Sequence, residues 1–345
     1  MRYRAVASLG VLLVAIAVMA VTTRSIAGQA SAARAKAPAA TKKWTVPRTP
    51  DGQPDIQGYW TNSSYTPLER ANNVAKEYYT PEEFAVVVKE AAAREAEQTE
   101  PGTIADVHYD FTQFGLDRSQ SAFVKSNLRT SLIVDPPGGK LPPLTPEGQK
   151  RAADRAAERR RMGATTDAVQ NMPIGTRCLI MAGSGPPMMS AGYNSNYQIV
   201  QGKGYVMILV EMIHDARIIP IDNRAPLPAT MTQWMGDSRG HWDGDTLVIE
   251  TTNLNAKNPF RGSSEKMKVT ERLTRIDADT ISYRFTVDDP GTWTTPWTAE
   301  TPMTKSVGPI FEHACHEGNY GVMNTLAGAR LEEKKAAAGA AKTAK

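Results

Sequence analysis

Residues 196–211 read NYQIVQGKGYVMILVE, and this stretch decides the fold class. Two runs of strand-forming residues flank Gly202-Lys203-Gly204, a connection typical of β-hairpins. From Asn194 onward the hydrophobic pattern has a period of two, whereas the pattern before it is helical. We therefore expect a hairpin here. Its second strand, Tyr205–Val210, is apolar on both faces, so we expect the N-terminal helices to cover its outer side.

Further hairpins follow, with no helix predicted between them. Asp243-Gly244 and Asp277-Ala278-Asp279 are turn sequences between strand-like runs. The strands predicted in this part of the chain cover residues 241–242, 246–252, 267–276, 280–287, 298–303 and 310–313. Sequential hairpins at this spacing predict a mainly β protein, an antiparallel up-and-down barrel or a sandwich.

Two helices are predicted before the barrel region, and both begin with threonine and proline. Thr80-Pro81-Glu82-Glu83 places an N-cap, a proline at the first helical position and an acid at the third, which makes a capping box. Thr145-Pro146-Glu147 repeats the first three elements. In the helix over residues 145–162 only alanines form an apolar face, so we expect it on the surface, and both helices packed outside the barrel.

The first 27 residues have the layout of a secretory signal peptide. Arg2 and Arg4 precede the uncharged run 5–21, and Ser25 and Ala27 stand at the −3 and −1 positions of a cleavage site. An uncleaved membrane anchor is the alternative, because the run approaches the roughly 20 residues that span a bilayer. We expect a protein exported to the periplasm or the extracellular space, with no membrane span after cleavage.

The domain organisation and the charge follow from this signal. The chain divides into a signal peptide at 1–27, a flexible leader at 28–53, an N-terminal helical and irregular region at 54–169, an antiparallel β-barrel domain at 170–326 and an Ala/Lys-rich tail at 327–345. The signal holds three arginines and no acid, so its removal lowers the number of Lys and Arg residues from 40 to 37 (40 − 3), nearly balanced by the 36 Asp and Glu residues. A near-neutral protein without a basic face does not suggest a nucleic-acid partner.

Cys178 and Cys315 are the two cysteines of the chain. An oxidising compartment favours their pairing into one disulfide. The bond would close a loop of about 137 residues, which in the chain-entropy model stabilises by about 4–5 kcal/mol. The alternative is a thiolate at Cys315 that acts as a metal ligand or a nucleophile.

Five sequence runs carry a resemblance to a known group of proteins. They are YNSNYQIVQ (193–201), EMIHDARIIPID (211–222), GDSRGHWDGDTLVIETTN (236–253), VDDPGTWTTPWTAE (287–300) and HACHEGNY (313–320). These runs resemble a large group of exported bacterial proteins whose architecture is similar to that of calycins, the lipocalin-like barrels. The resemblance covers roughly 170–330 and implies a barrel that holds a small ligand at its mouth. It carries no catalytic assignment, so the roles of the candidate residues come from their chemistry.

Glu271 is the sharpest candidate for a catalytic group. In the predicted strand 267–276 it lies on the same face as Met267, Val269 and Leu273, so a carboxylate stands in the apolar row. If the side chain is turned inward, burial raises its pKa unless a cation such as Arg217 or Arg239 lies near. General acid–base chemistry and a structural ion pair at the barrel rim both remain open.

Four of the five histidines fall in the predicted barrel region at strand ends or turns, where ligand sites form; the fifth is His108. Any one of them could instead satisfy local backbone groups. The candidate catalytic residues are Glu271, His214, His241, Arg217, Arg239 and Asp215. In this scheme the carboxylate and a histidine would move protons, and an arginine would hold an anionic group.

Aromatic residues beside acids suggest a pocket for a flat or cyclic ligand. Asp288-Asp289 stand near two tryptophans, in a pattern that also suits a packed strand corner. The candidate ligand-binding residues are Trp242, Trp293, Trp297, Tyr193 and Asp237.

The HACHE run gives weak metal candidates in His313, His316 and Glu317. On a strand, positions three apart point to opposite faces, so both histidines could bind one ion only if the chain turns between them. A disulfide at Cys315 would also remove the thiolate. We expect no metal and no other cofactor.

The sequence contains no P-loop and no G-x-G-x-x-G after a strand, so nucleotide cofactors are not expected. Gly183-Ser184-Gly185 precedes two prolines, which suits a bend rather than a nucleophile elbow, so serine-esterase chemistry is not expected either. Three functions remain. The first is a cofactor-free acid–base enzyme, a lyase, hydratase or isomerase, for a small and aromatic or cyclic molecule. The second is a non-catalytic, lipocalin-like binding protein, and the third is a metal-binding protein. The ionisable residues gathered in the barrel region favour the enzyme.

Overall fold

The computed structural model describes residues 44–95, 126–181, 183–190 and 194–343. The signal peptide, the leader up to residue 43, His108 and Tyr193 lie outside the described residues. Residues from Thr45 onward form one compact unit, and this unit is the subject below. No helix in the described ranges is long and apolar enough to cross a membrane.

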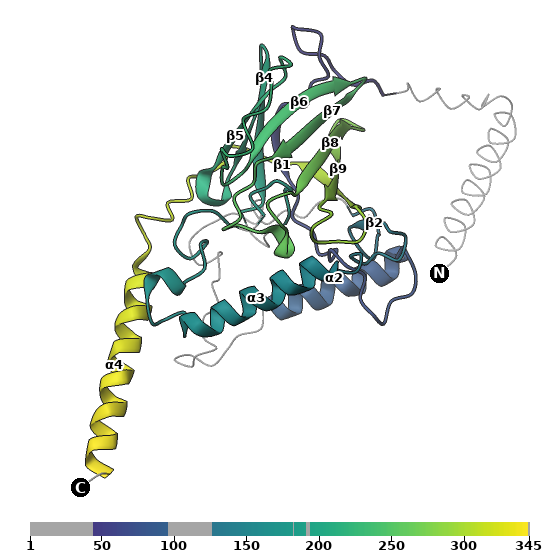
Figure 1. Ribbon diagram of the computed structural model, residues 1–345. Helices are drawn as coiled ribbons and strands as arrows, with labels where there is room; N and C mark the ends of the chain where they lie inside the picture. Colours follow the sequence, from purple (N-terminus) through teal and green to yellow (C-terminus); the bar gives the residue numbers. More distant parts are fainter. Residues whose placement is uncertain (1–43, 96–125, 182, 191–193, 344–345) are drawn as a thin grey trace, which may run out of the picture. The chain divides into compact units, whose positions relative to one another are not determined.

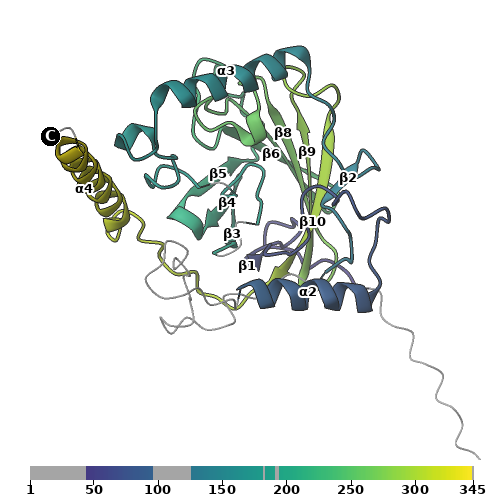
Figure 2. The same ribbon diagram turned by 90° about the horizontal axis from the view of Figure 1, so that it is seen from below.

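The core of this unit is one antiparallel sheet with the strand order β5-β4-β3-β1-β10-β9-β8-β7-β6 (Figures 1 and 2). Two meanders make up most of it. The first consists of β3 (Asn196–Gly202), β4 (Tyr205–Val210) and β5 (Ala216–Pro220). The second consists of β6 (Asp237–Asp243), β7 (Thr246–Thr252), β8 (Lys268–Arg275), β9 (Thr280–Asp288) and β10 (Trp297–Lys305). β1 (Gly58–Thr61) joins the meanders because it pairs with β3 on one side and β10 on the other.

The two outer strands of the sheet, β5 and β6, come close to each other. Arg217 of β5 donates a hydrogen bond to Ser238 of β6 over 3.2 Å. A Cβ atom on Gly240 of β6 would lie 2.9 Å from the side chains of Ile219 and Ile221, so glycine is needed for this approach. The sheet therefore curls into a nearly closed barrel, and the predicted fold class is confirmed.

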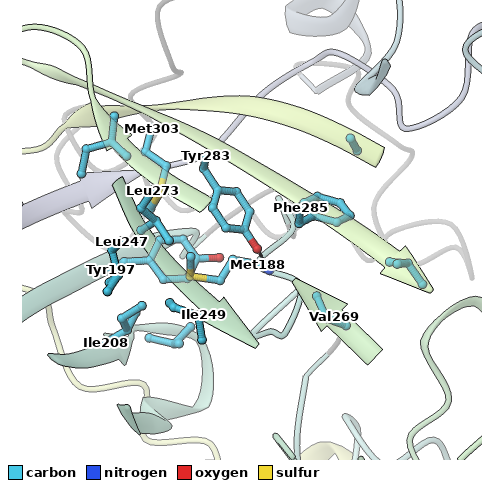
Figure 3. Close-up of a cluster of buried hydrophobic side chains, with 14 of the residues drawn as sticks. Met188, Tyr197, Ile208, Leu247, Ile249, Val269, Leu273, Tyr283, Phe285 and Met303 are labelled. Atoms are coloured by element: carbon cyan, nitrogen blue, oxygen red, sulfur yellow. Dashed lines mark hydrogen bonds between the residues drawn. The ribbon is translucent and has the colours of Figure 1, made fainter. Parts of the chain in front are cut away.

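Side chains from alternate strand positions fill the barrel. The buried cluster includes Leu247 and Ile249 of β7, Val269 and Leu273 of β8, and Tyr283 of β9 (Figure 3). This alternation is the period of two that the sequence displays, because successive strand residues point to opposite faces of a sheet.

The two predicted N-terminal helices are α2 (Pro81–Glu95) and α3 (Pro146–Met162). The capping box is present at α2: the Thr80 N–H donates to Glu83 Oε2 over 2.8 Å, and the Glu83 N–H donates to Thr80 Oγ1 over 3.3 Å. At α3, Thr145 Oγ1 accepts a hydrogen bond from the Gly148 N–H over 3.0 Å. Gly148 is the one buried residue of α3, which confirms its surface position.

α3 packs against connections at one end of the barrel (Figure 2). Arg151 donates to the carbonyl of Gly291, between β9 and β10, over 2.9 Å. Arg155 donates to the carbonyl of Ser263, just after the 3-10 helix η5 (Phe260–Gly262), over 3.1 Å. The barrel end that α3 covers contains the start of β8 and the end of β7, and we call it the α3 end.

The strand predicted at residues 310–313 is wrong, because this segment is irregular. Both edges of the preceding strand, β10, are already occupied: β9 pairs along one, and β1 and β2 (Ile133–Asp135) pair along the other. The sequence patterns also missed β1, β2 and β5, and β6 begins four residues before the predicted 241–242. The barrel thus draws strands from the region expected to be helical and irregular.

The C-terminal helix α4 (Tyr320–Thr343) includes the Ala/Lys-rich tail. Arg330 donates to the carbonyls of Thr166 and Asp167 over 3.1 and 3.0 Å. Just before the helix, Cys315 and Cys178 form the predicted disulfide, with a Cα–Cα distance of 5.8 Å. The bond joins the segment before the barrel strands β3–β10 to the segment after them.

Candidate functional site

Glu271 lies inside the barrel and forms an ion pair with Arg217. The side chain of Glu271 has no exposed surface, and that of Arg217 is 2% exposed. Arg217 Nη1 donates to Glu271 Oε1 over 3.1 Å, and Nη2 donates to Oε2 over 2.5 Å. The Tyr283 hydroxyl donates to Oε1 over 2.7 Å. Both carboxylate oxygens of Glu271 therefore accept hydrogen bonds from protein groups.

Neighbouring polar groups extend this network. Arg217 also donates to Ser238 Oγ over 3.2 Å, and the Met188 N–H donates to the Tyr283 hydroxyl over 2.8 Å. Burial and the charge of Glu271 raise the pKa of Tyr283 well above its ordinary value. Burial likewise raises the pKa of Tyr197. Both hydroxyls are therefore neutral donors at physiological pH.

The charge of Arg217 is stabilised by its partner. Burial alone would lower the pKa of the guanidinium, but the charge and hydrogen bonds of Glu271 outweigh this effect and raise it. Of the two interpretations left open for Glu271, the geometry favours a structural ion pair, located in the barrel interior rather than at its rim.

Arg239, His241 and Asp237 do not join this network. All three lie on the outer face of β6, opposite Ser238, because alternate residues of a strand face opposite ways. Arg239 pairs with Asp237 over 2.5 Å, and His241 is exposed. Of the candidate catalytic residues on the barrel strands, Glu271 and Arg217 thus contact each other, whereas Arg239 and His241 lie apart from them.

Two further candidates lie between β4 and β5. Asp215 is half-buried just before β5. His214 ends the 3-10 helix η4 (Met212–His214), and its side chain lies outside the described part of the structure, as does all of Tyr193.

The candidate aromatic residues pack in the core. Trp293 and Trp297 meet edge to face with ring centroids 5.7 Å apart, and both are buried. Trp297 also stacks on Phe260 at 6.1 Å. Trp242 is half-buried and packs against the hydrophobic core of the barrel. The arrangement matches the packed strand corner that the sequence left open.

The HACHE run forms a turn after the barrel. Cys315 is in the disulfide, His313 is half-buried, and His316 and Glu317 are exposed. No group of three His, Cys, Asp or Glu side chains within the described residues is arranged to hold a metal ion.

A pocket with a volume of about 520 Å³ opens at the α3 end of the barrel. Most of its lining is apolar. The lining residues are Met181, Gly183, Gly185, Pro186, Pro187, Met189, Ser190, Met212, Trp234, Leu254, Asn258, Pro259, Phe260, Arg261 and Met267. None of the candidate side chains that the structure describes lies in it, because the lining comes mainly from irregular segments, where hydrophobic periodicity carries no signal.

The segment 183–189 separates this pocket from the buried ion pair. Gly185 lines the pocket, and a Cβ on Gly185 would lie only 3.5 Å from Arg217 Nη1. Met188 is completely buried, and its N–H binds the Tyr283 hydroxyl on the inner side (Figure 3). The ion pair therefore lies directly behind the pocket wall, without being part of it.

Comparison of the chain with protein-family models, with curated proteins and with solved structures found no match. The arrangement of the pocket and the ion pair is thus the basis for a functional proposal.

Proposed function

We propose that the protein binds a small, largely apolar organic molecule in the pocket at the α3 end of the barrel. The lining of this pocket is the observation that supports the proposal: among its described residues, only Ser190, Asn258 and Arg261 are polar. The volume of about 520 Å³ falls within the roughly 300–1,000 Å³ usual for small-molecule sites. This corresponds to the second of the three functions considered from the sequence.

The side chains at the pocket also suit binding rather than reaction. Met181, Met189, Met212 and Met267 all contribute to the lining. Methionine is unbranched and polarisable, so its side chain adapts to ligands of different shape. We therefore propose tolerance for a class of apolar compounds rather than selection of one.

An acid–base reaction is the second proposal. It would use Glu271 and Tyr283, which lie behind the pocket wall, and it would require the segment 183–189 to move. Both carboxylate oxygens of Glu271 already accept hydrogen bonds from protein groups. The geometry therefore supports the binding proposal more than the acid–base proposal.

We also propose that the protein acts after export. The N-terminal pattern of charge and hydrophobicity supports this, and so does the disulfide, because such bonds persist mainly in oxidising compartments.

Titration with N-phenyl-1-naphthylamine, a neutral apolar fluorophore, tests the binding proposal. We expect saturable binding with energy transfer from Trp234. The substitution Met189→Gln should weaken binding roughly tenfold, because it places an amide against an apolar ligand. Met231→Gln is the matched control, since Met231 is 55% exposed and lies outside the pocket lining. Equal affinities of the two variants would contradict the assignment of this pocket.

A further inference from the structure

Arg261 differs from every other residue of the pocket lining because it carries a charge. Its side chain is exposed at the pocket. Within the described parts of the chain, no residue makes a hydrogen bond or an ion pair with the Arg261 guanidinium. This cation at an otherwise uncharged lining is thus available to a ligand.

The backbone of η5 holds Arg261 in an unusual conformation. Arg261 has φ of +52° and ψ of +29°, in the left-handed region that residues other than glycine seldom adopt. Such conformations persist where surrounding contacts impose them, and they are frequent at ligand sites. The Ser263 N–H closes the turn by donating to the Phe260 carbonyl over 2.9 Å.

α3 supplies the contacts that fix this turn. Arg155 donates to the Ser263 carbonyl over 3.1 Å, and Arg151 donates to the Gly262 carbonyl over 3.5 Å. On the far side, Ser264 donates through its N–H and its hydroxyl to the Asp289 carboxylate, each over 2.6 Å. The position of Arg261 at the pocket is therefore set by contacts on both sides of its loop.

The surroundings of the loop are rich in positive charge. Burial, Arg151 and Arg159 all lower the pKa of Arg155, which reports on how closely these cations gather. Acids lie among these cations as well: Asp289 accepts a hydrogen bond from Ser264, Glu147 lies 3.6 Å from Arg151, and Asp154 and Glu158 of α3 pair with Lys150 and Arg161. None of these acids lies in the described pocket lining, so Arg261 supplies the charge that a bound molecule meets there.

We propose that the ligand is an amphipathic organic anion, with an apolar body in the methionine-lined pocket and one carboxylate or sulfonate group against Arg261. This inference rests on the proposed function and specifies its ligand class. Arg261 is a specificity-determining residue in this scheme, whereas the methionines supply affinity for any apolar body.

Two fluorophores that differ by one charged group test this. The anion 1-anilinonaphthalene-8-sulfonate has the ring system of N-phenyl-1-naphthylamine plus a sulfonate. The ratio of the two dissociation constants, neutral over anionic, should fall about fivefold in Arg261→Gln, as expected for one partly solvated ion pair. In Arg261→Lys this ratio should stay close to the wild-type value, because lysine keeps the positive charge. In the wild-type protein, added salt should lower it, because exposed charges are screened.

Arg160→Gln is the matched control, because Arg160 is exposed on α3, lies outside the lining and carries the same charge. It should leave the ratio unchanged and should bind the neutral probe as the wild type does. An unchanged ratio in Arg261→Gln overturns the anion proposal while the binding proposal stands. Failure of both probes to bind the wild type contradicts the binding proposal and the anion proposal together.

Discussion

At the scale of single residues, the Arg217–Glu271 pair is the most consequential feature of the barrel interior. Two opposite charges removed from water depend on each other, and removing one leaves the other buried and unpaired. Here Tyr283, Ser238 and Thr251 add hydrogen bonds to the pair, while Arg217 Nε has no partner among the described residues.

We expect Glu271→Gln to lower the free energy of unfolding by about 3–5 kcal/mol, because Arg217 would lose its countercharge. Denaturant unfolding measures this. The matched control is Glu250→Gln, which breaks the exposed Lys268–Glu250 ion pair of the neighbouring strands. That variant should lose less than about 1 kcal/mol. Similar small losses in both variants would show that the inner pair contributes little.

Tyr283 gives the stability a dependence on alkaline pH. Its pKa in the folded protein is raised above the ordinary value of 10.0, so the folded state favours the neutral hydroxyl. The corresponding stability is complete below pH 10 and is lost as the pH rises toward the folded pKa, because only the unfolded state ionises there. Tyr283→Phe should lower the free energy of unfolding by about 1–3 kcal/mol at pH 7. Above pH 10 this free energy should decline less steeply in the variant than in the wild type.

Unfolding measured from pH 8 to 11 tests this dependence. Tyr205→Phe serves as the control, since Tyr205 is 42% exposed. Tyr197 preserves part of the alkaline decline in Tyr283→Phe, because burial raises its pKa as well. If the free energy of unfolding declined equally with pH in the wild type and in Tyr283→Phe, Tyr283 would not be a source of the alkaline decline.

The sequence could predict that Glu271 points inward, because its alternation with Val269 and Leu273 is local. It could not decide between Arg217 and Arg239 as the partner. That choice depends on which face of β5 and β6 turns inward, and β5 was not recognised from its pattern. The pocket residues could not be predicted for another reason: they lie in loops that only the closed barrel brings together.

At the scale of elements, the sequence predicts features that depend on neighbouring residues, and it does not predict strands whose position depends on distant pairing partners. The capping residues Thr80 and Thr145 fixed the starts of α2 and α3 because a cap needs only residues within one turn. The hairpins around residues 202–204, 243–244 and 277–279 were predicted for the same reason. β1 was missed because four residues carry little periodicity, and their place between β3 and β10 depends on partners far along the chain.

At the scale of the whole molecule, the disulfide and β1 both link distant parts of the chain. We expect Cys178→Ser combined with Cys315→Ser to lower the free energy of unfolding by up to about 4–5 kcal/mol, because the bond closes a loop of 137 residues in the unfolded state. Thermal or denaturant unfolding measures the loss. Thiol labelling without reductant should modify neither cysteine of the wild-type protein, and two labelled thiols would rule the bond out.

The position of β1 sets a limit on when the barrel can form. Trp60 pairs with Lys305 of β10, so the sheet cannot close before almost the whole chain is available. Such a high contact order makes folding slow, since the entropy of closing a long loop is lost before the pairing stabilises it. Until β10 is available, β1 can pair only with β3, and its other edge stays unpaired. Late completion of the barrel is compatible with the proposed export, because a chain whose barrel has not closed can still be threaded through a translocation channel.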